Sequence, residues 1–344
     1  MSEPTRRELL AAGALSLGAA GLARAQDAAQ PRYDTDPGRH ALRFDLKGVE
    51  VGCALDPRGP TGVSVLRFPR RALCVADVRG GGPATSFVDV ARDSGAELDA
   101  ICFSGGAVYG LAAADGVRRA LWEARQGSVD WEQLARVSAA AIYDLPAQRA
   151  KRKLAPDAAL GRAALAAAKP GIAPRGARGA GASASVGKWF PRLSPELAGQ
   201  GAAFRKAGKT RILVISVVNA LGAIVDREGQ VVRGHLDPTT GKRYAVGPET
   251  IVAPKRAPRG GNTTLTAVVT NRRLTPYALR QLAREVHTSM ARAIHPFHGL
   301  SDGDVLFAAS TGELAADPAV NAYQLAALGS ACAWDAVLTS FLGR

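Results

Sequence analysis

A threonine stands at the junction between a loop-like and a strand-like segment, where nucleophilic chemistry is possible. The stretch RAPRGGNTTLTAVVTN covers residues 256–271. Arginines, a proline and paired glycines precede Asn262-Thr263, whereas β-branched and apolar residues follow over residues 264–270. A threonine hydroxyl becomes a useful nucleophile at the start of a chain, because its own α-amine then serves as the base. Cleavage before Thr263 would create this arrangement, although from these residues alone a plain loop–strand junction is the favoured interpretation.

Two further short motifs carry groups that could take part in such chemistry. Asp302-Gly303-Asp304 places two carboxylates in a turn, where they could bind a cation, orient an ammonium group, or act as base and orienter. The alternative is an Asx turn with two solvated acids. Ser185 and Lys188 match the S-x-x-K pattern of serine acyl-enzymes, but the partner motifs and a clear helix start are missing, so a serine nucleophile is disfavoured. Lys188 could still act as a desolvated or charge-partnering lysine.

The histidines and cysteines give no metal-binding pattern. His40, His235, His287, His295 and His298 lack the spacing of a zinc site, and we expect no metal or other cofactor. His287 falls beside the apolar stripe of a predicted helix and is interpreted as structural, while His295 and His298 flank the turn before Asp302. The four cysteines show no CxxC spacing.

The elements that must position these residues can be read from apolar periodicity and turn signals. Thr275-Pro276 is typical of a helix start, and the apolar stripe from Leu279 to Met290 predicts that helix. A glycine turn at 104–106 leads into another helix, and a last helix is expected over 319–342. Strands are predicted at 63–68, 72–78, 100–103, 211–218, 264–270 and 305–309, with a hairpin over 223–233. This irregular alternation predicts a layered α/β sandwich.

The N-terminus resembles an export signal. Arg6-Arg7 precedes an apolar run from Leu9 to Ala23, and Ala23-Arg24-Ala25 supplies small residues at the −3 and −1 positions of a cleavage site. We therefore predict a twin-arginine leader over 1–25, a single catalytic domain over 26–344, and a periplasmic or secreted protein without stable membrane insertion. Because this route exports folded proteins, free buried thiols are expected instead of disulfides.

The charge is strongly positive but scattered. The chain of 344 residues has a formal net charge of +14, and removal of residues 1–25 leaves +13. Such a charge favours anionic partners in general. Lys and Arg are nevertheless spread along the chain without interleaved aromatic residues, so a solvated basic surface is favoured over nucleic-acid binding.

Several ordered motifs resemble those of a known family. The stretches GGNTTLTAVVTN and VHTSMARAIHPFHGLSDGDVLFAAST, together with AIYDLPAQ, GAGASASVGK and AIVDREGQVVRG, are similar to the P1 (DmpA-like, S58) peptidases. The resemblance runs from about residue 40 to the end and is greatest to the endo-type 6-aminohexanoate-oligomer (nylon oligomer) hydrolases within that family. It reverses the preference for a plain loop–strand junction.

The resemblance implies a fold, a cleavage site and a set of residues. The fold is an αββα four-layer sandwich similar to N-terminal nucleophile hydrolases. Self-cleavage between Asn262 and Thr263 would give an α chain of residues 26–262 and a β chain of residues 263–344 that stay associated. The matching motifs place the catalytic group on five residues: Thr263, Lys188, Asn219, Asp302 and Asp304. Tyr143 matches a tyrosine near the active site of the family.

The implied roles follow from ordinary chemistry. Thr263 attacks an amide and forms an acyl-enzyme, Asn219 donates an N–H to the oxyanion, and Lys188 keeps the threonine amine neutral by repulsion. Asp302 and Asp304 hold the amine and the hydroxyl in register.

The substrate and the assembly stay open at this stage. Residues 240–261 match the family poorly, and the leader is unlike the cytoplasmic nylon-oligomer enzymes. The expected substrate is a linear oligo-amide or a short peptide. The alternatives are an aminopeptidase, β-aminopeptidase or D-amidase/esterase of the same family, and an uncleaved, non-catalytic binding protein. The resemblance also implies a homo-oligomer, a tetramer or larger.

Overall fold

The computed structural model describes residues 32–148, 154–247 and 261–344, and Tyr33–Arg344 forms one unit in it. The predicted leader therefore lies outside the described residues. So do residues 248–260 of the loop before Thr263, whereas Gly261 and Asn262 are described.

Within the described residues, the main sheet contains ten strands in a mixed arrangement. The order along the sheet is β11-β12-β15-β17-β3-β5-β6-β4, with β2 and β7 joined beside β3. The strands are β2 (Glu50–Asp56), β3 (Thr61–Val78), β4 (Ala84–Ser86), β5 (Ala96–Ser104), β6 (Val137–Ala141), β7 (Lys169–Pro170), β11 (Gln200–Ala207), β12 (Thr210–Asn219), β15 (Thr263–Arg272) and β17 (Val305–Leu314).

This sheet folds into two layers that face each other across a central core. Buried side chains alternate along each strand between this central core and an outer core. On β12, Leu213, Ile215 and Val217 belong to the central core, whereas Ile212, Val214 and Val218 belong to an outer core. Phe103 of β5 and Phe307 of β17 meet in the central core with ring centroids 6.1 Å apart. The strands are buried on both faces, so each layer packs against the central core on one face and against an outer core on the other.

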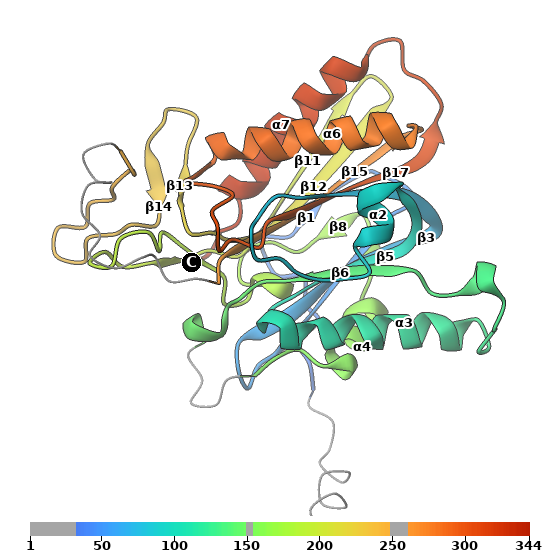
Figure 1. Cartoon of the computed structure of the whole chain (residues 1–344), viewed down its shortest axis with the longest axis horizontal. Helices are drawn as coiled ribbons and strands as arrows, with labels where there is room; N and C mark the ends of the chain where they lie inside the picture. Colours follow the sequence, from blue (N-terminus) through green and yellow to red (C-terminus); the bar gives the residue numbers. More distant parts are fainter. Residues whose placement is uncertain (1–31, 149–153, 248–260) are drawn as a thin grey trace, which may run out of the picture. The chain divides into compact units, whose positions relative to one another are not determined.

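Helices cover the two outer faces (Figure 1). The helices α6 (Pro276–Ser289) and α7 (Ala322–Leu338) pack on β3, β11, β12 and β17, and α3 (Ala112–Ala124) and α4 (Ala158–Ala166) pack on β2, β3, β5 and β6. Two helix-covered cores thus flank the central core between the strand layers. The predicted αββα sandwich is confirmed.

The long strand β3 joins the two layers and corrects one prediction. The sequence predicts two strands, 63–68 and 72–78, whereas the structure has one strand from Thr61 to Val78. Its pairing with β5 shifts register between Arg67 and Ala72, where the exposed Pro69 and Arg70 interrupt the apolar pattern. Val63 and Val65 face the α3–α4 core, and Val75 faces the α6–α7 core.

Shorter elements complete the unit. A three-stranded sheet contains β13 (Ala223–Val225), β14 (Val231–Arg233) and β16 (Ile294–His295), as the predicted hairpin required. The remaining short elements are β1 (Leu42–Arg43), β8 (Ile172–Ala173), β9 (Ser185–Val186), β10 (Glu196–Leu197) and α2 (Asp89–Asp93). The helix predicted after the 104–106 turn begins as a 3₁₀ helix at Ala107–Leu111 before α3.

Local predictions hold where the signals are strong. Thr275 caps α6, because its Oγ1 accepts the N–H of Ala278 at 3.2 Å, and Pro276 is the first helical residue. Cys53, Cys74, Cys102 and Cys332 are free and buried, as predicted, and burial raises the pKa of the Cys53 thiol to about 12. No helix among the described residues is long and apolar enough to cross a membrane.

Candidate active site

Three strand ends meet at one edge of the sheet and bring the predicted residues together. β12 runs antiparallel to β15, so that Asn219, the last residue of β12, lies opposite Thr263, the first residue of β15. β17 runs parallel to β15, and the residues before it form a bridge between Asn262 and Asp302. The topology thus places Asn219, Thr263 and the Asp302-Gly303-Asp304 turn side by side.

Thr263 lies against the carbonyl group of the peptide bond that precedes it. Its Oγ1 donates to the Asn262 carbonyl oxygen over 2.5 Å, and the Gly303 N–H donates to the same oxygen over 2.7 Å. Thr263 is 4% exposed and Asn262 is 1% exposed, so this group is shielded from bulk water. The nucleophilic oxygen and a donor to the carbonyl oxygen are therefore in place in the uncleaved chain.

The glycine between the two aspartates is required by this close approach. A Cβ atom at Gly303 would lie 2.7 Å from Thr263 Oγ1, which is closer than side chains pack. A residue with a side chain here would displace the threonine hydroxyl. The spacing of the Asp-Gly-Asp motif is thus explained by the hydroxyl that the glycine accommodates.

The two aspartates have different surroundings. Asp304 accepts the Thr264 N–H on Oδ1 over 2.6 Å, and its Oδ2 faces the N–H and the Nδ1 of His298. Asp302 accepts the Gly299 N–H on Oδ2 over 2.7 Å, whereas its buried Oδ1 has no hydrogen-bond partner among the described residues. Burial raises the pKa of Asp302 to about 6, with a further contribution from Asp304. Asp304 therefore fixes the main chain after the nucleophile, and Asp302 keeps a free oxygen.

Lys188 and Asn219 form a second group on the other side of Thr263. Lys188 Nζ donates to the main-chain oxygen and to Oδ1 of Asn219, over 3.0 and 2.9 Å. Desolvation of the ammonium lowers the pKa of Lys188 to about 7, although Asp302 and Asp144 act in the opposite direction. This lysine can change protonation near neutral pH.

The amide of Asn219 is held by contacts on both of its ends. Its Oδ1 also accepts the N–H of Ser185, and its Nδ2 donates to the Tyr143 carbonyl oxygen over 2.9 Å. Asn219 is fully buried at the end of β12. Ser185, part of the S-x-x-K pattern, lies in the two-residue strand β9 and contributes its main-chain N–H to this site.

Tyr143 contacts the residue before Asn262. Its side chain is 38% exposed, and a Cβ atom at Gly261 would lie 2.3 Å from Cδ1 of the tyrosine ring. Gly261 has φ +88°, a conformation that favours glycine. The segment that enters the site therefore has no side chain at Gly261, where it passes Tyr143.

A family model gives the chain its place among known proteins. The model of "Peptidase family S58" matches residues 44–341, which is most of the chain. The chain belongs to peptidase family S58. Like the named members of this family, it is a hydrolase of amide bonds.

Similar proteins with curated names fall into two groups. A 6-aminohexanoate-oligomer endohydrolase of Paenarthrobacter ureafaciens is 45% identical over 88% of this chain and 86% of its own length. A protein of Mycobacterium tuberculosis named as an uncharacterized aminopeptidase is 33% identical, covering 80% of this chain and 82% of its own. The S58 chain thus resembles endohydrolases more than it resembles aminopeptidases.

Solved structures support the fold. The Burkholderia β-aminopeptidase superposes with a TM-score of 0.63 at 20% identity, covering 89% of this chain and 88% of that one. The L-aminopeptidase D-Ala-esterase/amidase of Ochrobactrum anthropi, described as a variant of the Ntn hydrolase fold, gives a TM-score of 0.60 at 17% identity, covering 90% of this chain and 87% of that one. The S58 chain therefore has this variant of the N-terminal nucleophile fold.

Sequence reasoning missed one buried carboxylate of this S58 site. Asp144 follows Tyr143 within the quoted AIYDLPAQ motif and is 1% exposed. Its Oδ1 accepts the Gly106 N–H over 2.8 Å, and burial raises its pKa to about 6. The sequence predicts a glycine turn at 104–106, but the partner of its N–H groups could not be identified from local sequence.

His298 was noted for its place near the turn and not for its contact. Its hydrogen bond to Asp304 gives it a direct link to the strand that carries Thr263. His287, interpreted as structural, is buried and bonded to Asp77, which confirms that interpretation. Among the described residues, no group of three or more His, Cys, Asp or Glu side chains is arranged to hold a metal ion.

Proposed function

We propose that the chain is a self-processing amide hydrolase in which Thr263 is the nucleophile. The observation that carries this proposal is the position of Thr263 Oγ1 against the Asn262 carbonyl, whose oxygen already accepts the Gly303 N–H. Self-cleavage would divide the chain after Asn262 into an α chain, 26–262, and a β chain, 263–344.

The first reaction would act on the chain itself. Thr263 Oγ1 attacks the Asn262 carbonyl carbon, and the negative charge that forms on the carbonyl oxygen is stabilised by the Gly303 N–H. The C–N bond breaks, the nitrogen becomes the Thr263 α-amine, and Asn262 is joined to Oγ1 as an ester. Water then hydrolyses this ester and leaves a carboxylate on Asn262. The proton that Oγ1 loses is delivered to the nitrogen as the C–N bond breaks. Lys188 and Asp302, whose pKa values lie near neutrality, are proposed to relay it.

The second reaction would use the same oxygen on a substrate. The free α-amine of Thr263 now acts as the base, Oγ1 attacks the substrate amide, and an acyl-enzyme forms as the amine product leaves. Water releases the acyl group and restores the hydroxyl. The Gly303 N–H remains available to the oxyanion. Asn219 Nδ2 donates to the Tyr143 carbonyl oxygen and so fixes that neighbouring loop, while Asn219 Oδ1 accepts from Lys188 Nζ and fixes the lysine.

We propose unbranched linear oligo-amides as the substrate class. In the intact chain, Gly261-Asn262 occupies the acyl side of the site. The space around these two residues therefore indicates the shape that the acyl part of a substrate must have. Tyr143 leaves no room for a Cβ atom at Gly261, which suits a methylene chain. The similarity to 6-aminohexanoate-oligomer endohydrolases supports the same class.

Aminopeptidase action is the second candidate, favoured by the relatives named as aminopeptidases. Oligo-amides with a blocked amino end separate the two activities. We expect blocked and free oligomers to be cleaved at comparable rates. A strict requirement for the free amine would favour the aminopeptidase instead.

The nucleophile is tested by intact mass and N-terminal sequencing of purified protein. The wild-type chain should divide and yield a fragment that starts at Thr263. Thr263→Ala should stay whole and inactive, and Thr263→Ser, which keeps a hydroxyl, should still divide. Division of the alanine variant, or a wild-type chain that stays whole on long incubation, would show that the assignment is wrong.

Location and assembly are also part of the proposal. We infer export by the twin-arginine route from residues 1–25 and assembly into a homo-oligomer of four or more subunits. Light scattering of the processed protein would measure the assembly directly.

A further inference from the structure

His298 contacts one of the two aspartates of the site at close range. Its Nδ1 lies 3.0 Å from Asp304 Oδ2, and its main-chain N–H donates to the same oxygen over 3.2 Å. The other oxygen of Asp304 accepts the N–H of Thr264 over 2.6 Å. One buried carboxylate therefore connects His298 to the residue that follows the nucleophile.

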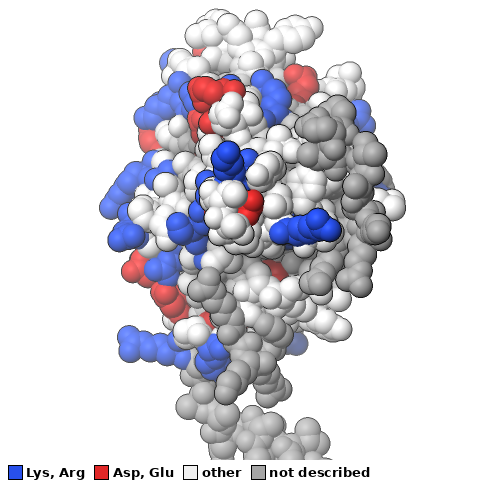
Figure 2. Space-filling view, turned by 90° about the vertical axis from the view of Figure 1, so that its left-hand side faces the viewer, with Lys and Arg blue, Asp and Glu red and all other residues white. Residues whose placement is uncertain are grey.

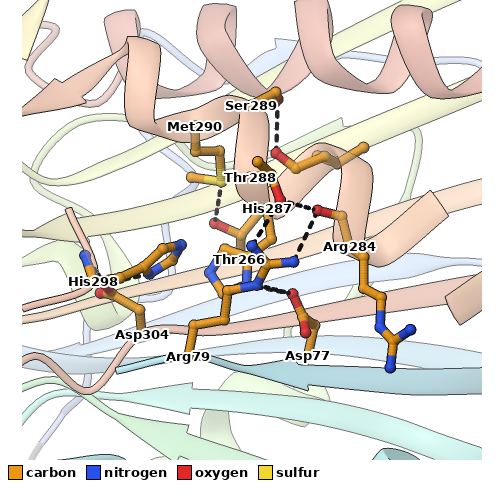
Figure 3. A network of polar contacts seen from close by, with 11 residues as sticks. Asp77, Arg79, Thr266, Arg284, His287, Thr288, Ser289, Met290, His298 and Asp304 are labelled. Carbon is orange, nitrogen blue, oxygen red and sulfur yellow. Dashed lines mark hydrogen bonds and ion pairs between the residues drawn. The ribbon is translucent and has the colours of Figure 1, made fainter. Parts of the chain in front are cut away.

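The imidazole of His298 is held by two rings, and Figure 3 shows it beside Asp304 together with the network around His287. The ring of Phe297 stacks on it with centroids 3.9 Å apart, and the ring of His287 meets it edge-on at 4.4 Å. His287 is in turn fixed by Asp77, whose Oδ2 lies 2.9 Å from His287 Nδ1 and also accepts from Arg79. Arg79 reaches Thr288 on α6. These contacts anchor His298 to the sheet and to the covering helix.

The protonation of His298 follows from these contacts. Because Nδ1 faces a carboxylate oxygen, it carries the proton and donates. Its Nε2 is buried and has no hydrogen-bond partner among the described residues. The charged groups around the ring are Asp304 and Asp302, with Asp77 and Arg79 behind His287, and burial keeps the pKa of His287 below its usual value. The ring thus directs its Nδ1–H at Asp304.

The backbone of His298 restricts which residues could replace it. Its φ of +62° lies in the left-handed region, which glycine, asparagine, aspartate and histidine adopt more readily than other residues. Replacements that keep this backbone are therefore asparagine, aspartate and glycine.

We propose that His298 is a positioning residue for Thr263: its Nδ1–H fixes the Asp304 carboxylate, which fixes the main chain directly after the nucleophile. This inference rests on the proposed function of Thr263. A carboxylate that is 1% exposed needs donors on both oxygens, and without Nδ1–H only the longer main-chain bond remains on Oδ2. Rotation of Asp304 would release the Thr264 N–H and shift Thr263 Oγ1 from the Asn262 carbonyl.

The test compares His298→Asn with His298→Asp. Both side chains have the same shape and tolerate the left-handed backbone, but asparagine can place an N–H where Nδ1 was, whereas aspartate places a second negative charge beside Asp304. We expect the rate constant of self-cleavage for H298N to stay within about threefold of wild type. For H298D we expect a fall of about 10- to 100-fold in that constant and in kcat, with KM changing less than about twofold. Measured on the soluble, folded protein, a first-order rate constant does not depend on the yield of a variant, so a lower yield alone would not change it.

Other outcomes identify which idea fails. Wild-type rates in H298D, or equal loss in H298N and H298D, would overturn the role of the Nδ1–H. If H298D gives no soluble protein, His298→Gly takes its place, because it keeps the backbone freedom and removes the donor; wild-type rates in H298G would likewise overturn the proposal. Thr263→Ala is run alongside: if it divides, the nucleophile is wrong and both proposals fall, whereas an undivided T263A with a fast H298D removes only the role of His298.

Discussion

At the scale of single residues, the site depends on distances that one added methyl group would disturb. Thr263 Oγ1, the Asn262 carbonyl and the Gly303 N–H form a group in which each atom is within hydrogen-bond range of the carbonyl oxygen. Effective concentrations in such arrangements are large, and a displacement of about 1 Å is enough to slow a reaction 100-fold. Gly303 is therefore as important to the geometry of the site as Thr263 itself.

Gly303→Ala should slow self-cleavage by about 10- to 100-fold, because the new Cβ would lie 2.7 Å from Thr263 Oγ1 and displace it. The rate of appearance of the β chain on a denaturing gel measures this. Gly82→Ala is the matched control on the neighbouring segment, since a Cβ there has its nearest atom at 3.8 Å. Equal rates in G303A and wild type would contradict the proposed geometry.

The protonation of Lys188 should be visible in the stability of the fold. Its pKa is lowered from 10.5 to about 7 by burial, so between these values the unfolded chain binds a proton that the folded chain has lost. The free energy of unfolding should therefore rise with pH across this window. Urea midpoints of Thr263→Ala, which keeps the chain whole, should increase from about pH 7 to about pH 9.5, and adding Lys188→Met should flatten that increase.

At the scale of elements, the sequence predicted those parts of the fold that local patterns determine. The helix capped by Thr275 and the buried strands β12 and β15 are confirmed because their signals lie within the segments themselves. The continuity of β3 was not predicted, since exposed residues interrupt its apolar pattern while pairing on both sides maintains the strand.

The candidate site divides in the same way. The motifs that resemble the S58 family assign Thr263, Asn219 and Lys188 to the site from the sequence alone. Asp144 and His298 were not assigned to the site, because their partners, Gly106 and Asp304, are identified by how loops approach one another in space. Periodicity and turn chemistry carry no information on such contacts.

The contact between the two strand layers should carry a large share of the stability. Phe307 is fully buried on β17 and faces Phe103 across the central core. Phe307→Ala removes this ring from a closely packed interior, so a loss of about 3–5 kcal/mol in the free energy of unfolding is expected. Chemical denaturation measures the loss. Tyr323→Ala, at a side chain that is 84% exposed, should change it by less than about 0.5 kcal/mol.

At the scale of the whole molecule, charge and thiols bear on where the enzyme works. On the face in Figure 2, Lys and Arg side chains are interspersed with acidic and uncharged residues, which suits a solvated basic surface. All four cysteines are free and buried. A protein that folds in a reducing compartment and is then exported has no need of disulfides.

Replacing Arg6 and Arg7 together by lysine should therefore keep the enzyme in the cytoplasm with residues 1–25 attached, because the paired arginines are the address that the export machinery reads. The wild-type protein should be recovered from the periplasm or the medium, with Gln26 as the N-terminus of its α chain. Cell fractionation and N-terminal sequencing measure both. The cytoplasmic variant should still divide at Thr263, since the site is built entirely from residues of the unit Tyr33–Arg344. Export of the double variant at the wild-type level would refute the leader, and a variant that stays in the cytoplasm undivided would show that processing depends on export.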